Sequence, residues 1–230
     1  MPYFLPRAIL FDLDGTLVDT APDLAAAVNR MRIEQNLPPA PYSVLRPVAS
    51  AGARGLIEAA YGIGPDDAAY DALRHAFLHN YAAALAVDSV IFDGILELLS
   101  TLSAMGIAWG IVTNKAARLT GPLVKLIGLQ QAACVISGDT TPHSKPHPEP
   151  LFEAARRLNL APELCWYVGD DLRDIQAGHA AGMFTIAVGW GYGGEVEPQS
   201  WQADLFVNDP LQLSEKIREI ALQSSQKTYK

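Results

Sequence analysis

The sequence predicts an α/β protein with a Rossmann-like, doubly wound parallel sheet and an inserted α-helical segment. Two observations predict the sheet. Short apolar runs alternate with longer helical patterns, and most of these runs are continuously apolar, as in strands buried on both faces. A third observation predicts the insertion, because residues 21–88 show helical patterns and no convincing strand. Half of the 230 residues are hydrophobic, which is enough for one large domain or a core with a small insertion.

The expected elements follow one another regularly along the chain. Apolar runs predict strands at 7–11, 108–113, 133–137, 165–169, 184–189 and 204–207, and the patterns between them predict helices at about 94–105, 116–127, 149–158, 172–181 and 211–222. Pro22 and Asp23 stand where the first inserted helix would begin. We therefore expect a core domain of residues 1–18 and 89–230, and a helical cap domain of residues 19–88.

Composition and charge exclude several classes of protein. The net charge of −8 and the pI of about 5.0 argue against nucleic-acid binding, which needs a basic face. No stretch approaches 18 uncharged apolar residues, and the first residues are too quickly charged for a signal peptide, so we expect a cytoplasmic protein without a membrane span. It would be a monomer or a homodimer. Cys134 and Cys165 lie in apolar runs and are expected to be buried free thiols.

Polar side chains follow four consecutive predicted strands of the core. They are Asp12 and Asp14, then Thr113, Asn114 and Lys115, then Lys145, and finally Asp170, Asp171 and Asp174. In open parallel sheets, ligands bind beyond the carboxyl ends of the strands. Turn chemistry alone explains an Asp-Gly dipeptide but not this set on one edge, so we expect one functional site there.

These side chains suit a phosphate group held beside a metal ion. The carboxylates of Asp12 and Asp170 are hard oxygen ligands of the kind that Mg²⁺ prefers. Thr113 can donate a hydroxyl hydrogen bond, and the backbone amides from Asn114 onward lead into a helix N-terminus, where anions bind. Lys145 supplies a positive charge for a phosphate oxygen. The sequence therefore predicts a Mg²⁺-dependent phosphate site.

The two neighbouring aspartates then have separate tasks. Asp12 can attack phosphorus to give an aspartyl phosphate, and Asp14 can protonate the leaving oxygen and later activate water. Gly15 lets the chain turn at once, and Gly15 and Thr16 are candidate substrate contacts. General acid help supplies only about 10²–10⁴ of the very large acceleration that phosphate esters require, so the metal and Lys145 must stabilise the transferring group.

Four stretches resemble the motifs of the haloacid dehalogenase superfamily. They are "DLDGTLVDT" (12–20), "IVTN" (111–114), "SKPHPEP" (144–150) and "VGDDLRDIQAG" (168–178), and they occur in the family's order over nearly the whole chain. The resemblance implies a Rossmann-like core with a helical cap after the first motif. It also implies a nucleophile at Asp12, an acid/base at Asp14 and phosphate contacts from Thr113 and Lys145.

The resemblance implies a metal site as well. Mg²⁺ would be bound by the carboxylates of Asp12 and Asp170 and by the backbone carbonyl of Asp14. Asp174 would orient metal-bound water, and Asp171 would support the site. The dehalogenase branch lacks the second aspartate. The presence of Asp14 therefore favours a phosphatase over a dehalogenase. A phosphomutase is also compatible with Asp14 but is less favoured than a phosphatase. A non-catalytic phosphate-binding protein is a remote alternative, since it would be expected to lack one of these residues.

Within the phosphatases, the chain resembles the phosphoglycolate phosphatase group. The stretches "SAGARGLI", "FDGILELL" and "WQADLFVNDPLQL" look most like bacterial N-acetylmuramic acid 6-phosphate phosphatases. The chain has "IFDG" (91–94) where many phosphoglycolate phosphatases have a "PYPG"-type sequence, so the sugar phosphate is the favoured substrate and 2-phosphoglycolate the alternative.

Three further features concern the substrate. Arg54, between glycines at an expected helix start in the cap, is the candidate for binding a substrate carboxylate; the alternative interpretation is a solvated surface arginine. Lys115 could be mistaken for the phosphate lysine, but the "SKPHP" context favours Lys145. In the glycine-rich loop 189–194, Trp190 or Tyr192 could touch substrate or a partner chain.

Overall fold

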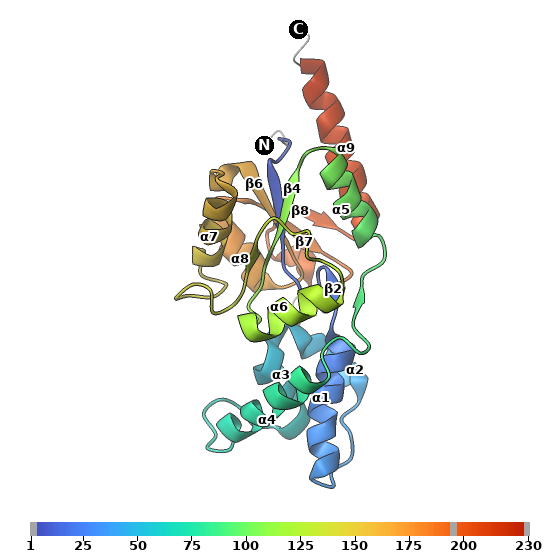
Figure 1. Ribbon diagram of the computed structural model, residues 1–230, viewed down its shortest axis with the longest axis vertical. Helices are drawn as coiled ribbons and strands as arrows, with labels where there is room; N and C mark the ends of the chain where they lie inside the picture. The colour runs from blue at the N-terminus through green and yellow to red at the C-terminus, as the bar shows by residue number, and fades with distance from the viewer. Residues whose placement is uncertain (1–3, 194–196, 228–230) are drawn as a thin grey trace.

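A parallel six-stranded sheet forms the centre of the molecule, in a computed structural model that describes residues 4–193 and 197–227 (Figure 1). The strand order is β5-β4-β1-β6-β7-β8. The strands are β1 (Ala8–Phe11), β4 (Ala108–Val112), β5 (Val135–Ile136), β6 (Cys165–Gly169), β7 (Phe184–Val188) and β8 (Leu205–Val207). The predicted α/β class and all six predicted strands are confirmed.

Strand β1 lies between β4 and β6, and the chain winds outward from it in both directions. Ala8 is level with Ala108 on one side and with Cys165 on the other. The loops that follow β1, β4 and β6 therefore emerge side by side at one edge of the sheet. This is the switch point at which doubly wound sheets bind ligands.

Helices cover both faces of the sheet. They are α5 (Ile95–Ala104), α6 (Ala117–Leu126), α7 (Glu149–Leu158), α8 (Leu172–Ala180) and α9 (Pro210–Lys227). Because side chains alternate along a strand, Ile9 and Phe11 of β1 pack with α5 and α9, whereas Ala8 and Leu10 pack with α7 and α8. The two cysteines, Cys134 and Cys165, are buried free thiols, as expected.

The inserted segment is helical, as predicted. It contains α1 (Ala21–Glu34), the single turn α2 (Tyr42–Leu45), α3 (Gly52–Tyr61) and α4 (Tyr70–Ala83), and it lies beyond the carboxyl edge of the sheet (Figure 1). It has its own apolar core, in which Met31, Leu56 and Phe77 are almost completely buried. Leu119 and Tyr192 from the other part of the chain pack against this core, so the cap is docked on the sheet domain.

A small antiparallel ribbon connects the two parts. Strand β2 (Val18–Asp19) pairs with β3 (Val90–Ile91), so the chain enters and leaves the cap through neighbouring strands. The sequence does not predict this ribbon, since two residues per strand are too few for a periodic pattern. The division into domains at residues 19 and 88 stays a prediction. In the described part of the chain, no helix has both the length and the hydropathy needed to cross a bilayer.

Candidate active site

Three carboxylates meet where β1 and β6 end. Asp12 follows β1, Asp170 follows β6, and Asp174 lies in the first turn of α8. One oxygen of each lies within 4.8 Å of the others, and all three residues are buried. Oδ1 of Asp12 makes no well-aligned hydrogen bond within the described residues, although the ammonium of Lys145 lies 2.8 Å away.

These three buried carboxylates repel one another when they are ionised, and a bound cation would reduce this repulsion. Burial, together with the charges of Asp12 and Asp174, raises the pKa of Asp170 well above its usual value. Burial also raises the pKa of Asp174, to about 7, although Lys145 opposes the shift. A donor set made entirely of buried carboxylates fits a hard divalent cation, which would offset the repulsion between them. The site is therefore suited to a divalent metal.

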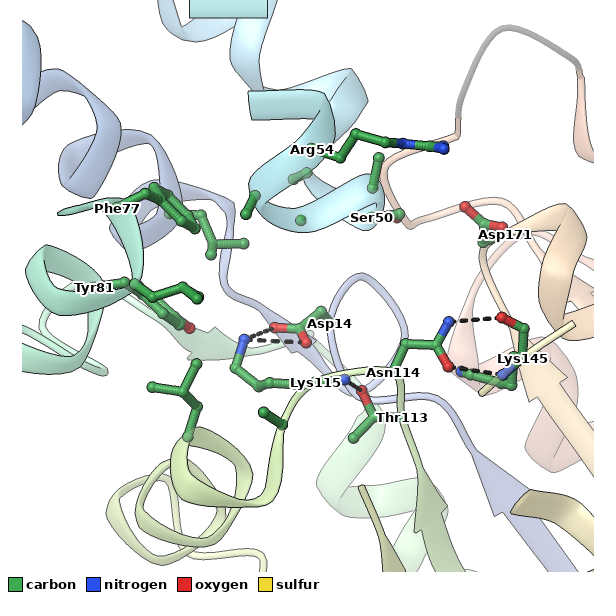
Figure 2. A pocket seen from close by; sticks show the side chains of 18 of the residues that line it. Asp14, Ser50, Arg54, Phe77, Tyr81, Thr113, Asn114, Lys115, Lys145 and Asp171 are labelled. Carbon is green, nitrogen blue, oxygen red and sulfur yellow. Dashed lines mark hydrogen bonds and ion pairs between the residues drawn. The ribbon is translucent and has the colours of Figure 1, made fainter. Parts of the chain in front are cut away.

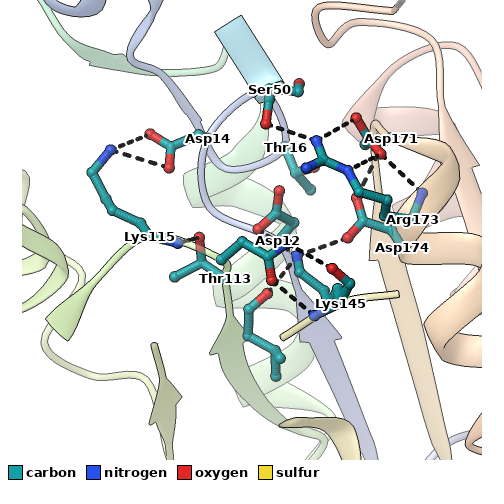
Figure 3. A network of polar contacts seen from close by, with 12 residues as sticks. Asp12, Asp14, Thr16, Ser50, Thr113, Lys115, Lys145, Asp171, Arg173 and Asp174 are labelled. Atoms are coloured by element: carbon teal, nitrogen blue, oxygen red, sulfur yellow. Dashed lines mark hydrogen bonds and ion pairs between the residues drawn. The ribbon is translucent and has the colours of Figure 1, made fainter. Parts of the chain in front are cut away.

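Lys145 is held rigidly beside this cluster (Figure 3). Its ammonium lies 2.7 Å from Asp174 and 2.8 Å from Asp12, and it also donates to the hydroxyl of Tyr167 and the carbonyl of Val112. Burial alone would lower the pKa of Lys145, but the two aspartates outweigh it and the pKa is raised. The lysine therefore stays charged. The side chain of Asn114 fixes its backbone, donating to the carbonyl and accepting from the amide of Lys145.

The carboxylate of Asp14 points away from the cluster of three carboxylates. It accepts two hydrogen bonds from the ammonium of Lys115, at 2.9 and 3.2 Å (Figure 2). It also accepts one from the hydroxyl of Thr20. The ammonium of Lys115 also lies over the ring of Tyr81, 4.5 Å from its centroid. Its backbone amide donates to the hydroxyl of the buried Thr113. Lys115 therefore belongs to the site, although it is not the lysine beside Asp12.

The loop after β1 holds Asp170 in place. Thr16 is fully buried, and its hydroxyl donates to Oδ1 of Asp170 at 2.9 Å. The backbone amide of Tyr192 donates to Oδ2 at 3.0 Å, and the cap residue Ser50 donates to the same oxygen at 3.2 Å. A Cβ on Gly15 would lie 2.1 Å from Oδ2 of Asp170, so only glycine fits there. The predicted substrate contacts of Gly15 and Thr16 stay predictions.

Asp171 supports the site through a contact with the cap. It caps the N-terminus of α8 by accepting from the amide of Arg173, and the two side chains form a double ion pair at 2.7 and 2.8 Å. Burial would raise the pKa of Asp171, but Arg173 outweighs it and the pKa is lowered. The guanidinium of Arg173 also donates to the carbonyl of Ser50 in the cap (Figure 3).

A cavity of about 570 Å³ lies between cap and core above these residues. Its floor holds the catalytic candidates, and its cap side is lined by both apolar and charged side chains (Figure 2). These cap residues include Leu24, Arg54, Tyr70, Arg74, Phe77, Leu78 and Tyr81. Arg54 is exposed and makes no contact with the aspartate cluster, but it does line the cavity.

Comparison with known proteins now decides the family. A sequence model of the haloacid dehalogenase-like hydrolases matches residues 9–188. The chain is a haloacid dehalogenase-like hydrolase. It is 48% identical to a phosphoglycolate phosphatase of Xanthomonas campestris pv. campestris, over 91% of this chain and 96% of the relative. It is 43% identical to an N-acetylmuramic acid 6-phosphate phosphatase of Pseudomonas putida, over 92% and 96%. The crystal structure of a predicted phosphoglycolate phosphatase from Haemophilus somnus superposes with a TM-score of 0.81 at 26% identity, covering 92% of this chain and 97% of that one.

The site of this hydrolase brings most of the predicted residues together. Asp12, Asp170 and Lys145 form one cluster. Asp174, which was predicted to orient metal-bound water, has an oxygen in the same cluster. Three contacts between cap and core were not predicted: Arg173 with Ser50, Ser50 with Asp170, and Tyr81 with Lys115. Arg173 lies within "GDDLRD", between predicted site residues, so its place near the site could have been predicted from the sequence. Nothing in the sequence indicates the contacts of Ser50 and Tyr81, because these contacts depend on how the cap docks on the core.

Proposed function

We propose that this hydrolase releases phosphate from 2-phosphoglycolate with the help of Mg²⁺. It is a phosphoric monoester hydrolase of the haloacid dehalogenase family, and it acts on a small phosphomonoester. The observation that carries this conclusion is the pairing of two aspartates with different surroundings. Asp12 lies with Lys145 in a cluster suited to a divalent metal, whereas Asp14 lies apart from it with Lys115.

The chemistry follows from these positions. A carboxylate oxygen of Asp12 forms a bond to phosphorus while the bond from phosphorus to the ester oxygen breaks, and Asp14 gives that oxygen a proton. Water then attacks the phosphorus of the aspartyl phosphate, with Asp14 taking its proton, and Asp12 is released. Lys145 and Thr113 hold oxygens of the phosphoryl group, which restricts its position during both steps.

The metal would be held by Asp12, Asp170 and the backbone carbonyl of Asp14, with Asp174 beside them. When bound, Mg²⁺ would stabilise the negative charge of the transferring phosphoryl group. Thr16, Tyr192 and Ser50 all donate to Asp170, and so they orient one of its ligands. Asp14 must leave Lys115 to reach the ester oxygen of a bound substrate.

The choice of 2-phosphoglycolate rests on the relatives, since a phosphoglycolate phosphatase is the more similar of the two enzymes compared, at 48% against 43% identity. N-acetylmuramic acid 6-phosphate, which the sequence analysis favoured, is the second candidate because of the cavity. A volume of about 570 Å³ lies within the range that holds drug-sized ligands, and it is larger than a two-carbon glycolate needs.

The test is phosphate release from both esters with Mg²⁺, compared by kcat/KM. We expect a preference for 2-phosphoglycolate. A preference for the sugar phosphate would transfer the proposal to the second candidate. Replacing Asp12 with Asn should lower kcat by about 10⁴-fold or more, because the nucleophile is lost. The matched control is Asp66→Asn in an exposed part of the cap, which should keep full activity. Turnover by Asp12→Asn at the normal rate would contradict the mechanism.

A further inference from the structure

Three arginines around the cavity have no side-chain partner among the residues that the structure describes. Most arginines of the described chain donate to a carboxylate, a carbonyl or a hydroxyl; these are Arg30, Arg32, Arg46, Arg156, Arg157, Arg173 and Arg218. Among residues 4–193 and 197–227, the side chains of Arg7, Arg54, Arg74 and Arg118 form no ion pair or hydrogen bond. All of these except Arg7 line the cavity.

The three cavity arginines come from both sides of the cavity. Arg54 lies in the first turn of α3 and Arg74 lies in α4, and both helices belong to the cap. Arg118 lies in the first turn of α6, in the core. All three side chains are exposed and can reach a ligand without leaving a buried position. The cavity is therefore bordered by guanidinium groups from both the cap and the core.

The other cations of the cavity are already paired. Lys145 faces Asp12 and Asp174, Lys115 holds Asp14, and Arg173 holds Asp171. Asp139, which also lines the cavity, accepts from the backbone amide of Ala117 and forms no ion pair with a described residue. In a chain with a net charge of −8, three guanidinium groups without a partner among the described residues border one cavity, where they favour the binding of an anion.

We propose that Arg54, Arg74 and Arg118 form a second anion subsite, which binds a carboxylate on the leaving group of the substrate. This inference rests on the proposed function, because the phosphate itself belongs beside Asp12 and Lys145. Guanidinium groups bind carboxylates through paired, charge-assisted hydrogen bonds. The subsite selects phosphomonoesters that carry a second anionic group, and it rejects neutral esters of the same size. Arg54 was a candidate from the sequence, whereas Arg74 and Arg118 are included because they line the cavity.

The experiment uses esters that differ only in the second anion. One pair is 2-phosphoglycolate and its amide. The other is N-acetylmuramic acid 6-phosphate and N-acetylglucosamine 6-phosphate, which lacks the lactyl carboxylate. We expect the native enzyme to prefer the acid by roughly 10- to 100-fold in kcat/KM, in whichever pair it turns over. Each of Arg54→Met, Arg74→Met and Arg118→Met should reduce this preference, and the triple variant should nearly abolish it.

The control variant is Arg7→Met, which removes an unpaired arginine that does not line the cavity and should leave the preference unchanged. The neutral esters report on the chemistry, and the arginine variants should lose much less kcat/KM on them than on the acids. Equal loss for acid and neutral esters, or no preference in the native enzyme, would overturn the subsite and leave the phosphatase intact. Failure of the native enzyme on every phosphomonoester would instead overturn the proposed function, and the subsite with it.

Discussion

Gly15 shows how closely the loop after β1 approaches the carboxylate of Asp170. Its φ angle is +88°, a left-handed conformation that glycine adopts without strain. A Cβ at this position would lie 2.1 Å from one carboxylate oxygen of Asp170 and 2.8 Å from the other. Because Thr16 and Tyr192 hold that carboxylate from other directions, Asp170 cannot move aside without losing a hydrogen bond. The loop and the carboxylate of Asp170 are therefore positioned together.

We predict that Gly15→Ala displaces Asp170 and impairs the metal site. The Mg²⁺ concentration needed for half-maximal activity should rise roughly 10- to 100-fold, which is the usual effect of disturbing groups that orient a ligand. A Mg²⁺ titration of phosphate release measures this change. The left-handed conformation should also cost about 1 kcal/mol of unfolding free energy, measurable in urea.

Gly128→Ala is the matched control for this variant. Gly128 also has a left-handed φ angle, +80°, but a Cβ there would meet no atom within 4 Å. It should lose a similar amount of stability through the backbone alone and keep its Mg²⁺ dependence. Equal Mg²⁺ dependence in the two variants would contradict the close approach as the reason for glycine at position 15.

At the scale of elements, the loop after β7 connects the metal site to the beginning of the cap. The indole of Trp190 donates to the carbonyl of Thr16, and the amide of Tyr192 donates to Asp170. The hydroxyl of Tyr192 accepts from the amides of Thr20 and Ala21, where α1 begins. These two aromatic residues therefore make structural contacts, and their predicted contact with substrate or a partner stays a prediction. Gly194 of this loop lies outside the described residues.

We predict that Tyr192→Phe weakens the attachment of α1 to the core. The hydroxyl is the acceptor for two buried amides, at 2.6 Å from Thr20 and 3.0 Å from Ala21, and its loss leaves Thr20 without that bond. The unfolding free energy should fall by about 1–3 kcal/mol, as determined by urea titration. The control is Tyr61→Phe, whose buried hydroxyl has no partner among the described residues. It should change stability by less than about 0.5 kcal/mol, and an equal loss in both variants would refute the argument.

At the scale of the whole molecule, the sequence predicts what local patterns encode. The strands are visible because each is a short apolar run, and the site is visible because its residues follow those runs directly. Parallel pairing then brings Asp12, Thr113 and Asp170 to one edge without any further information. The meeting of Asp12 and Asp170 follows from the topology, and so it could be predicted before any distance was known.

Contacts that depend on the docking of the cap could not be predicted in this way. The approach of Ser50 to Asp170, and of Tyr81 to Lys115, joins segments that share no local pattern. The direction of the Asp14 side chain was not predicted either, since it is set by hydrogen bonds from Lys115 of the core and from Thr20 rather than by its place in the motif. Long-range packing decides these details, and a short sequence pattern carries no record of it.

The concentration of buried carboxylates gives the whole molecule a stability that depends on pH. Burial, with Asp12 close by, raises the pKa of Asp170 well above its usual value and that of Asp174 to about 7. An unfolded aspartate has a pKa of about 3.9. Between these values the folded protein keeps protons that the unfolded chain has lost. Its stability without metal therefore falls as pH rises from about 4 through 7, by up to about 1.4 kcal/mol per pH unit for each proton kept.

We predict that Mg²⁺ stabilises the protein more at pH 8 than at pH 5.5, because the bound cation favours the ionised carboxylates. Thermal unfolding should give a Tm that decreases with pH in EDTA and changes much less in saturating Mg²⁺. Asp170→Asn removes one of the buried carboxyls, so it should flatten the curve in EDTA and reduce the shift caused by Mg²⁺. The surface control Asp66→Asn should behave like the native protein. Parallel curves with and without Mg²⁺ would show that the carboxylate cluster does not hold the metal, since the cation would then leave its protonation unchanged.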